Sequence, residues 1–204
     1  GLPTVISGII TFFYLTDHPT QAKWLNDSEK ALLANEIQHH QAASTHSGFG
    51  AVLKDPWVYF MAFAYFTIIS GIYAIGFWLP SLIKSSGIDD LNTIGWWSGI
   101  PYLLSAIFMI VFAKTSDKMQ ERKWHSVLAA VAAAALLIVS VLADSNFTLA
   151  FIAIAVATGL MWASYTIFWA IPSKYLKGSA AAGGIALINS IGLLGGFVSP
   201  NIMG

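Results

Sequence analysis

Residues 126–171 read SVLAAVAAAALLIVSVLADSNFTLAFIAIAVATGLMWASYTIFWAI, and Asp144 is the one charged residue in this stretch. It consists of two apolar runs, 126–143 and 147–171, separated by the short polar turn 144–146. An α-helix rises about 1.5 Å per residue, so roughly 20 apolar residues cross the ~30 Å hydrocarbon core of a bilayer. Each run is therefore predicted to be a membrane-spanning helix.

The same pattern extends over most of the chain. Three more apolar runs, 57–79, 93–113 and 179–204, are predicted to span the bilayer, and the charged residues lie in the polar windows between the runs. The 204 residues are 56% hydrophobic and 10% charged, whereas a soluble domain carries about 25% charged residues. This composition excludes a soluble enzyme and a nucleic-acid-binding protein. The absence of cysteine excludes disulfide bonds and cysteine-based metal sites.

The predicted fold class is all-α, a polytopic membrane helix bundle. A transmembrane β-barrel would need alternation with a period of two, which these runs lack. We divide the chain into 1–15, the end of a truncated helix; 16–56, a polar loop; and 57–204, the transmembrane bundle. The chain opens without Met and ends in an apolar run, so we expect it to be a piece of a longer protein.

The basic residues predict the orientation. Nine of the ten Lys and Arg residues lie in the loops before residue 57, after residue 113 and after residue 171, and only Lys84 lies in an intervening loop. Cytoplasmic loops of membrane proteins carry this excess of positive charge. In the first cytoplasmic loop, Asn26-Asp27-Ser28-Glu29 fits a capping box, with Leu33 and Ile37 at helical spacing behind it. We expect a short amphipathic helix there.

The spans contain no charged residue, and Asn189, near the midplane of the last helix, is their one mid-span amide. An amide in hydrocarbon needs a partner. Two interpretations remain open: a hydrogen bond between helices, or an amide that lines an aqueous cavity and holds a polar substrate. The surrounding glycines, which include Gly192 and Gly196, favour close helix packing or bending.

One face of the helix over 147–171 carries a polar stripe. Thr158, Trp162, Tyr165 and Trp169 follow one another at spacings of four, three and four residues, which places them on one side. They either line a cavity or pack against neighbouring helices. Tyr65, Ser70 and Tyr73 on the first full helix make a weaker case of the same kind.

Several motifs resemble a known family. The helix ends FWLP at 77–80 and FWAIP at 168–172 are alike, as in inverted-repeat transporters. The loop AKTSDKMQERK at 113–123 resembles the Gly-x-x-x-Asp-Arg/Lys signature of the major facilitator superfamily, with Ala113 and Gln120 at its glycine positions. The segments FYLTD at 13–17, AKWL at 22–25, GGIALINSIG at 183–192 and GGF at 195–197 are similar to the anion:cation symporter family, which includes tartrate-, phthalate- and nicotinate-type permeases.

The resemblance covers essentially the whole chain, as helices six to eleven of twelve. It implies a proton-coupled symporter in a bacterial cytoplasmic (inner) membrane, which imports a small organic carboxylate by alternating access. The implied partners are the organic anion, protons, the lipid bilayer and the missing N-terminal half of the protein, which would hold the cationic anchors and coupling carboxylates. A sugar transporter or a drug exporter of the same fold is the alternative. We expect no enzymatic activity, cofactor, metal or nucleic acid.

The resemblance also gives roles to individual residues. It assigns substrate contacts to Ser70, Tyr73, Trp169 and Asn189, and we add Tyr65, Trp162 and Tyr165 as cavity-lining candidates. Asp117 and Arg122 would form a cytoplasmic gating ion pair. The basic cluster around Arg122 can instead serve only to set the topology, and both interpretations stay open.

Overall fold

A computed structural model describes residues 2–14, 16, 21–22, 24–42, 49–143, 146–177 and 180–203. The described residues form helices and contain no strand, which confirms the predicted all-α class. Five helical segments among them are long and apolar enough to cross a membrane. The helices are α1 (Leu2–Tyr14), α2 (Asp27–Ala42), α3 (Phe49–Val52), α4 (Pro56–Ser85), α5 (Leu91–Met119), α6 (Lys123–Leu142), α7 (Phe147–Phe168), α8 (Ala170–Tyr175) and α9 (Ala180–Met203).

Side-chain caps fix where several helices begin. Asp55 precedes α4 and accepts a hydrogen bond from the Trp57 amide at 2.9 Å. Asp90 and Asn146 cap α5 and α7 in the same manner, by accepting from amides three residues further on. Such caps satisfy backbone N–H groups that have no partner within the helix. The helices of the bundle therefore start at polar residues just outside the apolar runs.

The helices extend beyond the predicted spans, and one of them is interrupted. α4 continues through Pro80 to Ser85, since a membrane helix tolerates a proline where neighbouring groups satisfy the freed carbonyl. The predicted span 147–171 is instead divided at Trp169 into α7 and α8. Pro172 offers no N–H, and its ring crowds the carbonyl of Phe168 four residues earlier. This accounts for the break.

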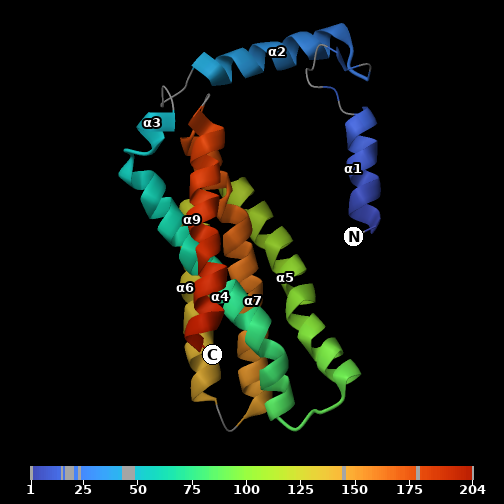
Figure 1. The fold of residues 1–204 in the computed structure, drawn as a ribbon, viewed down its shortest axis with the longest axis vertical. Helices are drawn as coiled ribbons and strands as arrows, with labels where there is room; N and C mark the ends of the chain where they lie inside the picture. The colour runs from blue at the N-terminus through green and yellow to red at the C-terminus, as the bar shows by residue number, and fades with distance from the viewer. Residues whose placement is uncertain are drawn as a thin grey trace.

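Three helix pairs hold the bundle together: α4 with α9, α5 with α7, and α6 with α7 (Figure 1). α7 is the most buried of the membrane spans. α1 stands apart from the bundle in Figure 1, and none of its residues is buried. α2 crosses above the end of the bundle where α9 begins (Figure 1).

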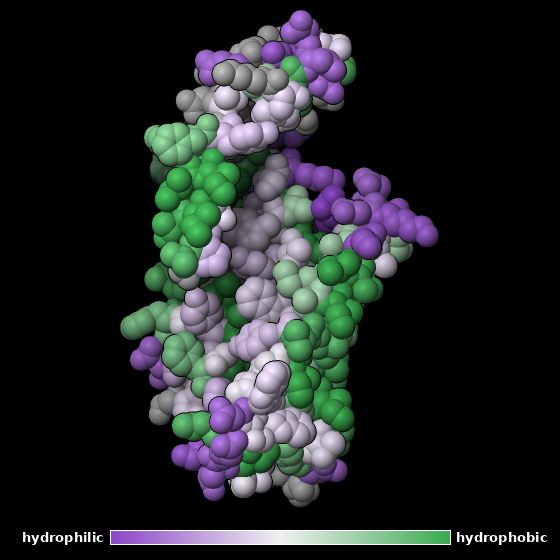
Figure 2. Space-filling model, turned by 90° about the vertical axis from the view of Figure 1, so that its right-hand side faces the viewer, coloured by the Kyte–Doolittle hydropathy of each residue, from purple (hydrophilic) through white to green (hydrophobic). Residues whose placement is uncertain are grey.

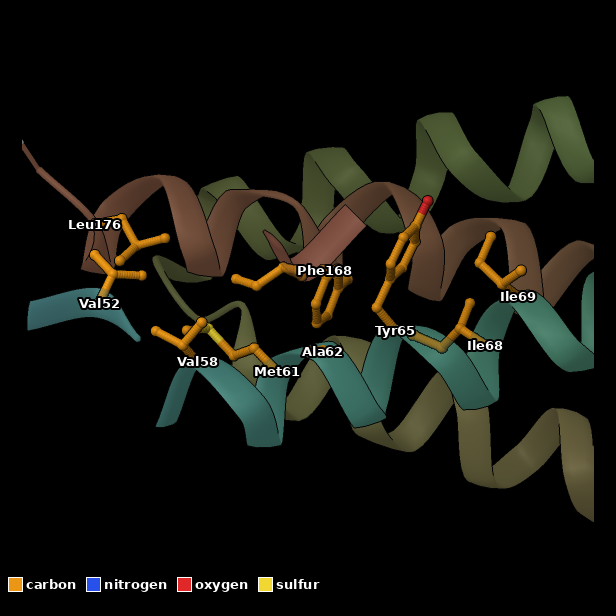
Figure 3. Packing of buried hydrophobic residues seen from close by; sticks show 10 residues of the cluster. Val52, Val58, Met61, Ala62, Tyr65, Ile68, Ile69, Phe168 and Leu176 are labelled. Atoms are coloured by element: carbon orange, nitrogen blue, oxygen red, sulfur yellow. The ribbon is translucent and has the colours of Figure 1, made fainter. Parts of the chain in front are cut away.

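The main hydrophobic cluster joins α3 and the first half of α4 to the end of α7, the residue after α8, and α9. Figure 3 shows most of its side chains, with Tyr65 projecting from α4 toward α7. The members of the cluster are Val52, Val58, Met61, Ala62, Tyr65, Ile68, Ile69, Phe168, Leu176 and Ile188. A second cluster around Leu79 and Phe151 lies at the other end of α4.

Glycines of α9 allow its close contact with α4. A side chain at Gly192 would collide with the ring of Tyr65, and one at Gly195 would collide with the backbone oxygen of Phe66. The two backbones can approach this closely only where one of them carries no Cβ. The small-residue surface predicted on this helix is therefore confirmed as a helix-packing surface.

The capping box of α2 is confirmed. The Asn26 side chain accepts from the Glu29 amide at 2.9 Å, and the Glu29 carboxylate accepts from the Asn26 amide at 2.9 Å. The predicted amphipathic face is weak, because the neighbours Leu32 and Leu33 point in different directions and are both exposed. The side chain of Ile37, as well as Asp17, Lys23 and the turn residue Asp144, lies outside the described part of the chain.

Candidate functional site

Four of the predicted site residues belong to one aromatic cluster, formed by Tyr65, Trp162, Tyr165, Phe168 and Trp169. The ring of Tyr65 stacks on Phe168 with centroids 5.5 Å apart and meets Trp169 edge-on at 4.8 Å. Tyr165 lies 5.9 Å from Tyr65 and 5.5 Å from Trp162, measured between ring centroids. With 2% of its surface exposed, Tyr65 is a core residue that joins α4 to α7 and α9.

Trp162 and Trp169 lie on one side of the α7–α8 segment, seven residues apart, and both are half-buried. The indole nitrogen of Trp162 is inaccessible and has no hydrogen-bond partner among the described residues. A buried donor without an acceptor is costly, by about 1–3 kcal/mol. This position therefore favours an acceptor that the described residues do not supply.

Thr158 differs from Trp162 and Trp169 of the predicted polar stripe in its burial and in its hydrogen bond. Its side chain is buried, and its hydroxyl donates to the carbonyl of Ile154 at 2.7 Å. The hydroxyl is thus committed to its own helix. Packing accounts for Thr158, whereas Trp162 and Trp169 remain partly exposed.

Tyr73 and Ser70 lie where α4 meets α9. A Cβ at Gly196 would stand 3.2 Å from the ring of Tyr73, and 41% of the Tyr73 side chain is exposed. The Ser70 hydroxyl donates to the carbonyl of Phe66 at 2.8 Å and lies against Gly195. Tyr73 is therefore available to a ligand, while the donor of Ser70 is occupied.

Asn189 is half-buried on α9, one turn before Gly192. Its amide makes no hydrogen bond with any other residue in the described ranges, so the interhelical bond considered above is not formed there. The side chain next to it, Ile188, is fully buried in the main cluster. Asn189 thus lies at the edge of the packed core with free donors and acceptors.

The packing of α4 changes along its length. Ala62, Tyr65 and Ile69 are buried, but Tyr73 and Phe77, on the neighbouring part of the helix surface further along, are exposed. Tyr73 and Phe77 thus lie on a different side of α4 from Ile75, Leu79 and Ile83, which are buried in the same half of the helix. Figure 2 shows a recessed band of near-neutral, white to pale purple residues between hydrophobic green surfaces.

A cavity of about 900 Å³ lies between the second half of α4, the end of α6 and the start of α7. Its lining is mostly apolar and includes Trp78, Leu79, Leu137 and Phe151. It contains none of the predicted site residues. A mostly apolar lining offers little to a polar substrate, so we do not place the site there.

The loop between α5 and α6 is ordered by polar contacts. Arg122 donates to the Asp117 carboxylate at 2.7 Å, and Gln120 adopts the left-handed conformation with φ 52°. The Glu121 carboxylate accepts from the Trp124 amide and meets the His125 ring at 3.1 Å. These hydrogen bonds, the Trp124 amide first, lower the pKa of Glu121. The predicted Asp117–Arg122 pair is therefore formed in the structure.

Some polar contacts were not predicted from the sequence. The Tyr175 hydroxyl donates to the Asp55 carboxylate at 2.7 Å and ties the end of α8 to the start of α4. Ser126 and Ser164 exchange hydrogen bonds between α6 and α7, with their hydroxyl oxygens 3.1 Å apart. These pairs join residues 120 and 38 positions apart in the chain, and no local pattern marks them.

Residues 1–200 match the family model described as Major Facilitator Superfamily. A protein of Agrobacterium vitis whose name assigns it provisionally to tartrate transport is 40% identical over 99% of this chain and 47% of its own length. The quinolone resistance transporter of Acinetobacter baumannii is 36% identical over 98% of this chain and 46% of its own. The inner membrane transport protein RhmT of Escherichia coli K12 is 31% identical over 98% of this chain and 46% of its own length.

The chain spans about half the length of these curated relatives. Their transporter names confirm the prediction that the chain is not an enzyme. The predicted resemblance to the major facilitator superfamily and its tartrate-type permeases is confirmed as well, because the family model covers nearly all residues and the relatives include one named for tartrate transport. On this evidence the chain belongs to the Major Facilitator Superfamily and is part of an integral membrane protein.

Proposed function

We propose that the whole protein is a secondary active transporter that imports a small organic carboxylate together with protons by alternating access. The observation that carries this proposal is the set of uncharged hydrogen-bonding groups, Tyr73, Trp162 and Asn189, whose polar atoms have no partner among the described residues. The relative named for tartrate transport supports a hydroxylated carboxylate as substrate.

In this proposal the described helices bind the neutral part of the substrate. The Trp162 indole N–H and the Tyr73 hydroxyl would donate to substrate oxygens, and the Asn189 amide could both donate and accept. Trp169 and Tyr165 would present ring surfaces, while Tyr65 and Ser70 would position their neighbours. The charge of the carboxylate would be met by cations outside this chain, because the middle of these spans carries none.

The test is uptake of labelled tartrate by the full-length protein in proteoliposomes. We expect accumulation against a gradient when the outside is acidic, and none when the pH gradient is dissipated. Asn189→Ala should raise KM several-fold with little change in the amount of folded protein. Absence of proton-driven uptake of tartrate and related hydroxycarboxylates would refute the proposed function.

We further propose that the Asp117–Arg122 ion pair biases the gating equilibrium at the cytoplasmic end. The pair joins the last turn of α5 to the residue before α6, so movement of either helix would strain it. A surface pair contributes under about 1 kcal/mol, but alternating states differ by only a few kcal/mol. Charge exchange, with Asp117→Arg and Arg122→Asp combined, should restore transport that either single change reduces.

Drug export is the second candidate, favoured by the 36% identity with the quinolone resistance transporter. The two functions differ in direction. Inverted vesicles that take up a fluoroquinolone when energised, without tartrate uptake in right-side-out proteoliposomes, would establish the exporter. The name of the Escherichia coli relative supports a bacterial inner membrane as the location in either case.

A further inference from the structure

Hydroxyl groups on the membrane helices differ in whether their own helix uses them. Several serines and threonines of the described spans donate to a carbonyl three or four residues earlier, as Thr67, Ser70, Ser105, Ser140, Thr158 and Thr166 do. Such bonds satisfy a hydroxyl in hydrocarbon without help from another helix. A hydroxyl that lacks one is free for other partners.

Two free hydroxyls lie one turn apart on α5. The Oγ atom of Ser98 is inaccessible and has no partner among the described residues. The hydroxyl of Tyr102, four residues later and on the same side, likewise makes no hydrogen bond to any residue that the structure describes. Neither residue was selected from the sequence.

The Tyr102 hydroxyl reaches toward α4. A Cβ at Gly76 would stand 3.4 Å from this oxygen, so the absence of a side chain at Gly76 leaves room for it. Tyr73 lies one turn before Gly76, on the part of α4 that faces Gly196 of α9. The part of α4 around Gly76 therefore has Tyr73 on the side that meets α9, and the hydroxyl of Tyr102 reaches it from α5.

The surroundings of Tyr102 leave space for a ligand. It is 44% exposed, and a Cβ at Gly99, one turn away on a neighbouring part of the helix surface, would meet nothing within 4 Å. Leu103, the next residue, is 72% exposed on another side of α5, where apolar residues predominate. By the predicted orientation this region lies in the outer half of the membrane.

We infer that Tyr102 is a further substrate-contacting residue, which donates a hydrogen bond to an oxygen of the transported hydroxycarboxylate on the outer side of the proposed site. This inference rests on the proposed function. It adds α5 to the helices that select the substrate, beside α4, α7 and α9. A second phenol donor in addition to that of Tyr73 would favour substrates that carry more than one acceptor oxygen.

Uptake kinetics test the contact. Tyr102→Phe keeps the ring and removes the donor, so KM for the hydroxycarboxylate should rise about three- to tenfold, as expected for one lost hydrogen bond. The matched control is Tyr59→Phe, since the Tyr59 hydroxyl donates to the Leu53 carbonyl at the opposite end of the bundle. An unchanged KM in Tyr102→Phe overturns the inference.

Labelling supplies a readout that does not depend on transport. The chain contains no cysteine, so single cysteines can be placed on a full-length protein freed of any others. Gly99→Cys should react with a membrane-impermeant maleimide and be protected by tartrate, while Leu103→Cys should not react. Unreactive Gly99→Cys, or reaction without protection, overturns the inference. If Gly99→Cys is labelled and protected but Tyr102→Phe leaves KM unchanged, Tyr102 only lines the site, and the proposed contact with the substrate is refuted.

The two proposals fail in different ways. If the unmodified protein takes up no hydroxycarboxylate, the proposed function fails, whatever the labelling shows. If the unmodified protein takes up the hydroxycarboxylate and Tyr102→Phe has the same KM, only the role assigned to Tyr102 is wrong.

Discussion

Gly195→Ala tests the close contact between α9 and α4. The added methyl group would collide with the backbone oxygen of Phe66 and lie 2.7 Å from the hydroxyl oxygen of Ser70 and 3.1 Å from its amide nitrogen. Two of these three atoms belong to the backbone, so no side-chain rotation relieves the contact. The helices must separate.

The expected cost follows from two opposing effects. Overpacking in a rigid contact costs about 1–3 kcal/mol, and contact with backbone atoms favours the upper value. Alanine is better than glycine within a helix by about 0.8–1 kcal/mol, which offsets part of the loss. The net destabilisation should therefore be about 2 kcal/mol.

Gly99→Ala is the matched control, because its methyl group would meet nothing within 4 Å. It keeps the helix-propensity gain without the collision, so the two variants should differ by about 3 kcal/mol. This difference corresponds to more than a hundredfold in the unfolding equilibrium constant, at about 1.4 kcal/mol per tenfold.

The measurement is unfolding of the full-length protein in detergent by titration with sodium dodecyl sulfate, followed by tryptophan fluorescence. Gly195→Ala should unfold at clearly lower denaturant than the parent, and Gly99→Ala at the same or higher. Equal midpoints for the two variants would refute the reasoning, since they would show that α9 and α4 do not approach as closely as described.

Three further predictions concern the predicted cytoplasmic end. Tyr175→Phe removes the bond to Asp55 and should lower the unfolding free energy by about 0.5–1.5 kcal/mol in the same titration; no change would show that the bond is broken in the membrane. Asp117→Asn should change that free energy by less than about 1 kcal/mol while altering the uptake rate, and a large loss of stability would contradict a surface pair. The hydrogen bonds that lower the pKa of Glu121 stabilise the start of α6. This stabilisation is complete at pH values above the ordinary pKa of a glutamate, and it should vanish as the pH falls through the lowered pKa. The protection factors of the first amides of α6, which are corrected for the intrinsic pH dependence of exchange, should therefore fall in acid, and protection factors that do not change with pH would be inconsistent with the carboxylate contact.

The membrane spans could be predicted because their signal is local. A run such as 126–143 carries no charge and lacks the alternation of a barrel strand, so a helix is the arrangement that satisfies its backbone in hydrocarbon. The ends were less certain. α4 passes Pro80, and the segment after Phe147 breaks at Trp169, because whether a proline is tolerated depends on which groups satisfy the freed carbonyl.

The candidate site could be predicted only in part. The spacing of Trp162, Tyr165 and Trp169 correctly placed them near one another, but it could not show that Tyr65 would be the buried centre of their cluster. Tyr102 was missed although Ser98 and Ser105, four residues before and three after it, lie on the same side of its helix. The hydroxyl of Tyr102 can reach α4 because Gly76, 26 positions earlier in the chain, leaves room for it, and the sequence does not show that these two residues meet.

The sequence by itself determined the helical class, the number and approximate position of the spans and the uncharged character of the bundle. These properties depend on transfer of each residue from water to hydrocarbon, a quantity that composition and run length already contain. Only the tertiary structure decided which polar groups are committed and which are free. The hydroxyls of Ser70 and Thr158 are used by their own helices, whereas the indole of Trp162 and the amide of Asn189 find no partner among the described residues. The bonds of Ser70 and Thr158 lie within one helix, but whether Trp162 and Asn189 find partners depends on distances between side chains of different helices, which are fixed by packing and not by any local pattern.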